Sequence, residues 1–267
     1  MPAADLALLI DAARAAGRIA LGYEGKEARR WDKPKGAGPV TEVDLAVNAM
    51  LEERLRAARP DYGWLSEETE DDPERLARER VFIVDPIDGT RSFADGSKTW
   101  AHALAVAEGG VVTAGVVYLP MRDLLYSAAA GQGAFLNDNR IAPSARNALD
   151  SAEILATRPN MDKLHWRGGQ VPGFSRAHRP SLAYRMALVA QGRFDGMLTL
   201  RPCWEWDIAA GDLILREAGA VCTDRAGAVL RFNNAVPKVN GVVAAGARIH
   251  RMIRDALAPE DPGAGPG

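Results

Sequence analysis

Two carboxylates stand three residues apart at Asp85 and Asp88, directly after the apolar run of residues 81–84. The run predicts a short buried strand, Pro86 fixes one backbone torsion between the acids, and Gly89 permits a tight turn. Two carboxylates on so short a loop repel each other unless a cation lies between them, and carboxylate oxygens are ligands that Mg²⁺ prefers. The spacing therefore favours a metal site, while Asp-Pro and Asp-Gly pairs are also common turn sequences.

Thr90 follows this loop and is predicted to cap a helical turn that runs to Ala94. A helix start carries free backbone N–H groups and favours an anion. One loop would then offer a metal site on one side and a phosphate site on the other.

Three more acidic clusters could add ligands. Glu67 and Glu68 follow a predicted short strand, but they also fit the acidic entry to a helix. Asp44 stands three residues after Thr41, where a capping box places its acid, and Asp207 stands at a predicted helix start. Helix capping alone would explain both Asp44 and Asp207.

The elements that position these acids fall into two groups. In the first half, helices are predicted over residues 5–23 and 41–58, a further helix around 74–79, and strands over 62–65, 81–84, 100–107, 111–118, 124–128 and 131–136. Gly109-Gly110 is a hairpin signal. Residues 32–39 read as a loop whose Lys33 and Lys35 could approach an anion, although solvation is the expected state. This half is predicted to be an α+β lobe, with an antiparallel sheet that helices cover on one face.

The second half alternates between short strands and helices, which is typical of an α/β lobe. Strands are predicted at 154–156, 194–200, 221 and 242–245, and helices at 181–192, 208–218 and 248–257. The polar stretch 137–150 marks the expected boundary, which gives an N-terminal lobe over 1–145, a C-terminal lobe over 146–258 that completes the site, and a flexible tail over 259–267.

Composition limits the class of function. The 267 residues are 47% hydrophobic and 25% charged with a net charge of −2, so no nucleic-acid polymer or membrane surface is expected as a partner. No apolar run is long enough to cross a bilayer, and residues 1–9 lack the basic cluster of a signal peptide. Cys203 and Cys222 fit neither a disulfide framework nor a zinc site, which favours reduced thiols and a cytoplasmic location. The four histidines match no motif and are expected to be structural.

Taken in order, the four acidic motifs resemble the lithium-sensitive, magnesium-dependent phosphatase superfamily, which includes inositol monophosphatases and 3′(2′),5′-bisphosphate nucleotidases. The strongest matches are Asp85-Pro86-Ile87-Asp88-Gly89-Thr90 and Trp206-Asp207-Ile208-Ala209-Ala210-Gly211. The resemblance extends from residue 5 to about residue 257. It implies a layered α-β-α-β-α sandwich of two lobes with the metal site between them.

The resemblance also assigns roles to individual residues. Two or three Mg²⁺ ions would be held by Glu67, Asp85, the Ile87 carbonyl, Asp88 and Asp207. Thr90, hydrogen-bonded to Asp44, would orient the attacking water with help from Glu67 or Glu68. The substrate would contact Glu67, Ile87, Asp88, Gly89, Thr90, Arg185 and Asp207. Positioning and metal electrostatics supply most of the rate in such a reaction, so no covalent nucleophile is needed.

The substrate is predicted from a smaller set of residues. Leu200 stands where inositol monophosphatases place an acid that contacts the sugar ring, while Leu65-Ser66-Glu67-Glu68 and Trp204-Glu205-Trp206-Asp207 look most like CysQ-type nucleotidases. Arg185 lies where those enzymes tend to have a lysine, and a guanidinium can hold a second phosphate in a bidentate manner. The sequence therefore predicts hydrolysis of the 3′-phosphate of 3′-phosphoadenosine 5′-phosphate.

Three other outcomes stay open. An inositol-1-monophosphatase or another sugar-phosphate phosphatase is the alternative enzyme, and a non-catalytic binder of Mg²⁺ or a phosphorylated metabolite is the alternative class. In each case the partner is a small phosphorylated metabolite. The resemblance also leads us to expect a homodimer.

Overall fold

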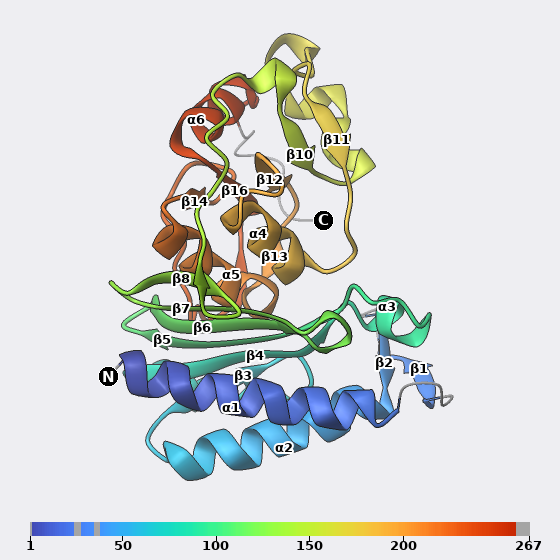
Figure 1. Cartoon of the computed structure of the whole chain (residues 1–267), viewed down its shortest axis with the longest axis vertical. Coiled ribbons are helices and arrows are strands. Elements are labelled where there is room, and N and C mark those ends of the chain that lie inside the picture. Colours follow the sequence, from blue (N-terminus) through green and yellow to red (C-terminus); the bar gives the residue numbers. More distant parts are fainter. Residues whose placement is uncertain (1, 24–27, 35–37, 260–267) are drawn as a thin grey trace.

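The computed structural model describes residues 2–23, 28–34 and 38–259, and it contains alternating layers of helix and sheet (Figure 1). A pair of helices covers one face of a seven-stranded sheet, a second pair separates this sheet from a five-stranded one, and a last helix covers the outer face. The helices are α1 (Pro2–Leu21), α2 (Glu42–Ala58), α3 (Thr90–Ala94), α4 (Leu182–Ala190), α5 (Glu205–Ala218) and α6 (Ala247–Ala256). The layered sandwich that the resemblance implied is confirmed.

The larger sheet has its strands in chain order, because hairpins join most of them. They are β3 (Gly63–Ser66), β4 (Arg80–Asp88), β5 (Ala101–Glu108), β6 (Val111–Leu119), β7 (Leu124–Ala129), β8 (Gly133–Leu136) and β9 (Asn139–Arg140). The pair β3–β4 is parallel and all other pairs are antiparallel. Gly109 and Gly110 form the predicted hairpin with φ of 56° and 81°, a backbone conformation that glycine adopts without strain.

The smaller sheet is mixed, with strand order β11-β10-β12-β16-β14. Its strands are β10 (Glu153–Leu155), β11 (Ser175–Ala177), β12 (Gly196–Thr199), β14 (Val221–Thr223) and β16 (Val242–Ala245). Two short antiparallel pairs lie outside the sheets, β1 (Arg30–Asp32) with β2 (Pro39–Thr41) and β13 (Cys203–Trp204) with β15 (Lys238–Val239).

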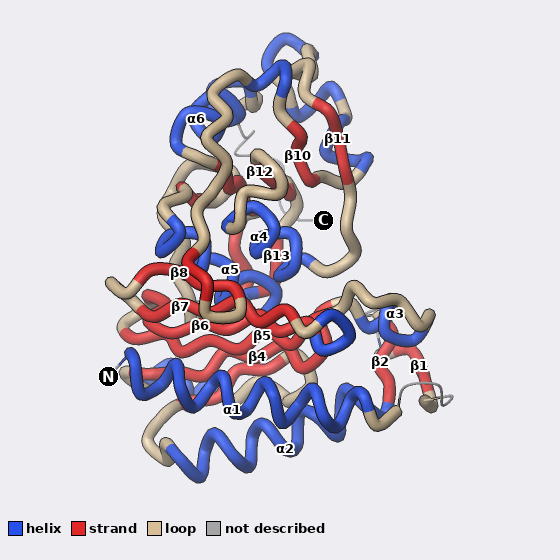
Figure 2. The backbone as a smooth tube through the Cα atoms, in the orientation of Figure 1, coloured by secondary structure: helices blue, strands red, loops and turns tan. Residues whose placement is uncertain are grey.

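Helices lie on both faces of the larger sheet, so the prediction of helices on one face was incomplete (Figure 2). Along β5 the alanines at 101, 103, 105 and 107 point into the core shared with α4 and α5, whereas Leu104 and Val106 point toward α1 and α2. This alternation is the two-residue period of a strand. The second half of the chain therefore supplies a layer that the first half lacks, and the boundary at residue 145 stays a prediction.

Small residues bring α5 close to its neighbours. A Cβ on Gly115 would lie 3.1 Å from the Ala210 carbonyl oxygen, and a Cβ on Gly211 would lie 2.7 Å from the Met186 side chain. The small residues after Asp207 thus leave room for strand β6 and helix α4 to pack closely against α5.

Strand β4 is longer than predicted and runs through the metal motif. Asp85 pairs with Ala103 and Asp88 pairs with Ala101, so three steps along β4 match two steps along β5. In a regular strand, residues three apart point to opposite faces, but one extra residue in a bulge returns the second side chain to the face of the first. The bulge therefore places both carboxylates on the α5 side of the sheet, and Pro86 is tolerated there because a bulge needs no ladder hydrogen bond from it.

Other boundaries differ from the predictions. The segment predicted as a loop over 32–39 contains the end of β1 and the start of β2, and the helix expected around 74–79 is a 3₁₀ turn, Pro73–Ala77. The tail from residue 260 and the position of Lys35 lie outside the described residues. Among the described helices, none combines the length and apolar character that a membrane crossing requires.

Candidate active site

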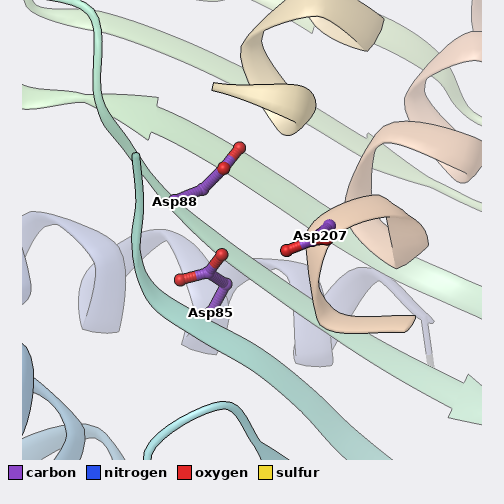
Figure 3. Close-up of side chains that lie close together, drawn as sticks. All are labelled: Asp85, Asp88 and Asp207. Carbon is purple, nitrogen blue, oxygen red and sulfur yellow. The ribbon is translucent and has the colours of Figure 1, made fainter. Parts of the chain in front are cut away.

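Asp85, Asp88 and Asp207 bring ligand oxygens within 4.8 Å of one another (Figure 3). The first two come from the bulge of β4 and the third from the first turn of α5, so two distant parts of the chain build the cluster. Asp85 and Asp88 are buried and Asp207 is half-buried. The sequence prediction that these three acids converge is borne out by the geometry.

The negative charges of this cluster repel one another, and a bound cation would offset that repulsion. Burial raises the pKa of all three carboxyls, and the nearby charges of Glu67, Asp88 and Asp207 raise the pKa of Asp85 further. The buried Oδ1 of Asp85 has no hydrogen-bond partner among the described residues. Since carboxylate oxygens are hard ligands and one of them is left unpaired, this donor set fits Mg²⁺.

Helix α4 orients Asp88. The Ser181 hydroxyl and the Ala183 backbone N–H both donate to Asp88 Oδ2 at 2.6 Å, and Ser181 Oγ also accepts from the Tyr184 N–H as the helix cap. One oxygen of Asp88 is thereby fixed by protein donors. The sequence predicts Ser181 at a helix start, but no local signal connects it to a carboxylate in another lobe.

Asp44 serves as a cap and as a partner of Thr90 at the same time. Its Oδ2 accepts from the Thr41 N–H at 2.9 Å and from the Thr41 hydroxyl, which completes the predicted capping box. Its Oδ1 lies 3.0 Å from Thr90 Oγ1, the contact that the resemblance implied. The same hydroxyl lies 3.2 Å from the Ile87 carbonyl, and because it has one proton it donates to one of these acceptors at a time.

Lys33 is a site residue that the sequence analysis assigned wrongly. Its Nζ lies 2.8 Å from Glu67 Oε1 and 2.6 Å from Glu68 Oε1, and its side chain is 14% exposed, not solvated as predicted. Burial raises the pKa of Glu68 to about 7, while the contacts with Lys33 oppose that rise. The sequence could not predict this contact, because the position of Lys33 depends on the pairing of β1 with β2.

Glu67 lies outside the 4.8 Å cluster, which among the described residues contains only the three aspartates. It is nevertheless close enough to raise the pKa of both Asp85 and Asp207. Glu67 therefore borders the cluster, held by Lys33, and its role as a ligand stays a prediction.

Arg185 lies in the first half of α4 and is 8% exposed. Its Nη2 donates to the Pro180 carbonyl at 3.0 Å, and its buried Nε has no hydrogen-bond partner among the described residues. Burial lowers its pKa, and the charge of Asp88 acts in the opposite direction. Leu200, in contrast, is buried in the core under α6, so it offers no polar group to a substrate.

Gly89 joins the bulge of β4 to α3 with φ of 99°, a left-handed conformation that favours glycine. The helical turn to Ala94 forms as predicted, but the prediction that Thr90 caps it is wrong: Gly89 occupies the cap position, Thr90 is the first residue of α3, and no side chain caps this helix.

Comparison with known proteins agrees with these motifs. Residues 3–260 match the inositol monophosphatase family. An inositol-1-monophosphatase of Mesorhizobium japonicum is 33% identical over 94% of this chain and 95% of its own length, and one of Rhizobium meliloti is 39% identical over 70% and 73%. The crystal structure of the extragenic suppressor protein suhB from Bartonella henselae superposes with a TM-score of 0.79 at 31% identity, covering 94% of this chain and 97% of that one.

The family match spans nearly the whole chain, and the acids that carry the motifs meet in one place. The chain belongs to the inositol monophosphatase family of magnesium-dependent phosphatases and is a phosphoric monoester hydrolase.

Proposed function

We propose that this protein hydrolyses an inositol monophosphate to inositol and inorganic phosphate. The observation that carries the proposal is the meeting of Asp85, Asp88 and Asp207 within 4.8 Å, in a chain whose relatives include named inositol-1-monophosphatases. Those relatives favour this substrate over the bisphosphate nucleotide that the sequence motifs suggested.

Metal binding is assigned to the acids of both lobes. Asp85, Asp88 and Asp207 would hold Mg²⁺, with Glu67 and the Ile87 carbonyl as the remaining protein ligands. When bound, the ions offset the charge of the phosphate, lower the pKa of a coordinated water and stabilise the leaving oxygen. The bonds from Ser181 and Ala183 leave the second oxygen of Asp88 for this role.

The other residues orient water and substrate. Thr90 would donate a hydrogen bond to Asp44, so its oxygen lone pairs are free to accept a hydrogen bond from the attacking water and align that water with phosphorus. Glu67 or Glu68 would assist by taking up the proton that this water loses. The backbone amides of Gly89 and Thr90 would donate to the phosphate oxygens.

A second candidate is hydrolysis of the 3′-phosphate of 3′-phosphoadenosine 5′-phosphate. Two observations favour it: Leu200 offers no carboxylate to a sugar ring, and Arg185 presents a buried guanidinium with an unpaired N–H beside Asp88. A buried guanidinium suits a substrate with a second anionic group.

The test compares catalytic efficiency for the two substrates. Phosphate release by the purified full-length protein in Mg²⁺ is followed with inositol 1-phosphate, 3′-phosphoadenosine 5′-phosphate and a simple monoester such as glycerol 2-phosphate. We expect the highest kcat/KM for inositol 1-phosphate, and loss of activity in EDTA that added Mg²⁺ restores. A clear preference for the bisphosphate would replace the proposal with the second candidate.

Arg185→Ala separates the two candidates further. If Arg185 binds a second phosphate, the substitution lowers kcat/KM for the bisphosphate more than for the simple monoester, whereas equal losses remove Arg185 from substrate selection. Absence of phosphate release from every monoester, with Mg²⁺ binding intact, would identify a non-catalytic binder.

A further inference from the structure

The bulge that aligns the two aspartates leaves a backbone carbonyl without a regular partner in the sheet. Asp85 pairs with Ala103 and Asp88 with Ala101, so Pro86 and Ile87 together face the single residue His102 of β5. Pro86 has no N–H, and its carbonyl lies where the ladder is interrupted. A buried carbonyl of this kind needs a donor from outside the regular ladder.

His102 supplies that donor. It is fully buried, and its Nδ1 lies 2.5 Å from the Pro86 carbonyl oxygen. A carbonyl only accepts, so Nδ1 must carry the proton and Nε2 the lone pair. Nε2 is buried and has no hydrogen-bond partner among the described residues. Burial lowers the pKa of His102 to about 4, so the ring is neutral at neutral pH.

Neighbouring rings fix the orientation of the imidazole. Trp100 meets the His102 ring edge-on, with centroids 5.4 Å apart and planes at 76°, and the Tyr118 ring is tilted by 37° with its centroid 6.4 Å away. The N–H therefore points at one carbonyl of the bulge and has little freedom to turn away.

We propose that His102 is a positioning residue, which holds the Pro86 carbonyl and thereby fixes the bulge that directs Asp85 and Asp88 to one metal site. The Pro86 carbonyl belongs to the peptide plane that joins Pro86 to Ile87, midway between the two acids, so a donor to this carbonyl restrains the path of the chain from Asp85 to Asp88. This inference rests on the metal-dependent activity proposed above, but it makes a claim about metal binding that does not depend on the substrate.

Two substitutions of His102 separate the hydrogen bond from the space that the ring fills. His102→Asn keeps an N–H donor at about the position of Nδ1, and His102→Leu fills similar space without a donor. Mg²⁺ binding by each full-length protein is measured by calorimetry, well below its melting temperature. We expect His102→Leu to weaken Mg²⁺ binding by about 10- to 100-fold, the usual effect of losing a group that orients metal ligands. His102→Asn should recover most of the affinity.

In steady-state kinetics with inositol 1-phosphate, His102→Leu should lower kcat at a fixed Mg²⁺ concentration and raise the Mg²⁺ concentration needed for half-maximal rate, with little change in KM. Wild-type Mg²⁺ affinity in His102→Leu would overturn the proposal. So would equal weakening by both substitutions, since ring volume and not the hydrogen bond would then be responsible.

The tautomer gives a test that needs no variant to fold. In the wild-type protein, ¹⁵N NMR of the imidazole should show a protonated Nδ1 and an unprotonated Nε2 at pH 7, and a protonated Nε2 would overturn the proposal. If the wild-type protein binds Mg²⁺ but releases no phosphate, the proposed function is wrong, but the proposed role of His102 in metal binding is not contradicted.

Discussion

At the scale of single residues, hydrogen bonds from the protein hold some carboxylate oxygens of the candidate site and leave others unpaired. Asp88 Oδ2 accepts hydrogen bonds from Ser181 and Ala183. Asp44 accepts from Thr41 with Oδ2 and from Thr90 with Oδ1. Asp85 Oδ1 is left unpaired among the described residues. Such fixed donors hold the ligands in place before a cation arrives, which reduces the rearrangement that binding requires.

Asp88→Asn should lower kcat far more than it lowers stability. The amide oxygen can still accept from Ser181 and Ala183, but one negative ligand is lost, and weaker metal binding should cost at least about 10³-fold in kcat. In metal-free buffer, urea unfolding should show equal or higher stability, because one of several repelling carboxylates is gone.

Asp95→Asn is the matched control, since the Asp95 side chain is 72% exposed and its ion pair with Arg30 is long, at 4.0 Å. It should leave both kcat and stability unchanged. Comparable losses of kcat in the two variants would argue against Asp88 as a ligand.

The raised pKa values predict how stability changes with pH. A carboxyl whose pKa is higher in the folded state binds its proton more tightly there, so its stabilising effect is present at low pH and is lost as pH rises through the folded pKa. Glu68, with a pKa near 7, and the three raised aspartates should make the metal-free protein less stable between about pH 5 and pH 8.

Mg²⁺ should reverse this trend, because the ion binds the deprotonated carboxylates. Thermal melts at pH 5.5, 7 and 8.5 should show a melting temperature that falls with pH in EDTA and a Mg²⁺-induced increase that grows with pH. A Mg²⁺-induced increase of the same size at all three pH values would contradict this assignment of the carboxyls.

At the scale of elements, helix α5 carries one ligand and depends on close contact with the larger sheet. Gly115 of β6 leaves room for the Ala210 backbone, only a few residues from Asp207. The position of α5 therefore sets the third corner of the cluster, whereas the bulge of β4 sets the other two.

Gly115→Val should displace α5 and impair the site. Valine favours strands, so any loss reflects the contact with Ala210 and not strand propensity, and such overpacking costs about 1–3 kcal/mol. Urea unfolding should detect that loss, and Mg²⁺ affinity should fall with it. The control Val111→Ala changes an exposed residue of the same strand and should alter neither. Unchanged Mg²⁺ affinity in Gly115→Val would show that α5 adapts without moving Asp207.

At the scale of the whole molecule, a hydrogen-bond network around Arg75 and Glu205 joins the two halves of the chain. Arg75 is 2% exposed and donates to Asn233 Oδ1 at 2.6 Å and to the Asn234 carbonyl at 2.9 Å. The N–H groups of both asparagines donate to Glu205, the first residue of α5, at 2.6 Å and 2.9 Å. The 3₁₀ turn after Glu67 and Glu68 is thus tied to the helix that carries Asp207.

Arg75→Met should weaken this connection. Four charge-assisted hydrogen bonds are lost, two to Asp71 and one each to Asn233 and Asn234, so the free energy of unfolding should fall by about 3 kcal/mol. Mg²⁺ affinity should also fall, because Asp207 then moves more freely relative to Asp85. Arg78→Met, an exposed change nearby, is the control. Lower stability with wild-type Mg²⁺ affinity would show that the network stabilises the fold but does not affect metal binding.

The sequence alone predicted the features that depend on neighbours within a few residues. The apolar run before Asp85, the Thr41 capping box and the Gly109-Gly110 hairpin are local patterns, and all three form as predicted. The order of the acidic motifs then indicated the family and most of the acids that gather in the site.

Only the tertiary structure decided which groups meet across the lobes. The contacts of Lys33 with Glu67, of Ser181 with Asp88 and of His102 with Pro86 join separate elements, and each depends on a hairpin, a helix position or a bulge. Such contacts follow from strand register and the packing of layers, where a shift of one residue turns a side chain to the opposite face. The sequence therefore determined the chemistry of the acids, and the packing of the sheets and helices determined how they are held.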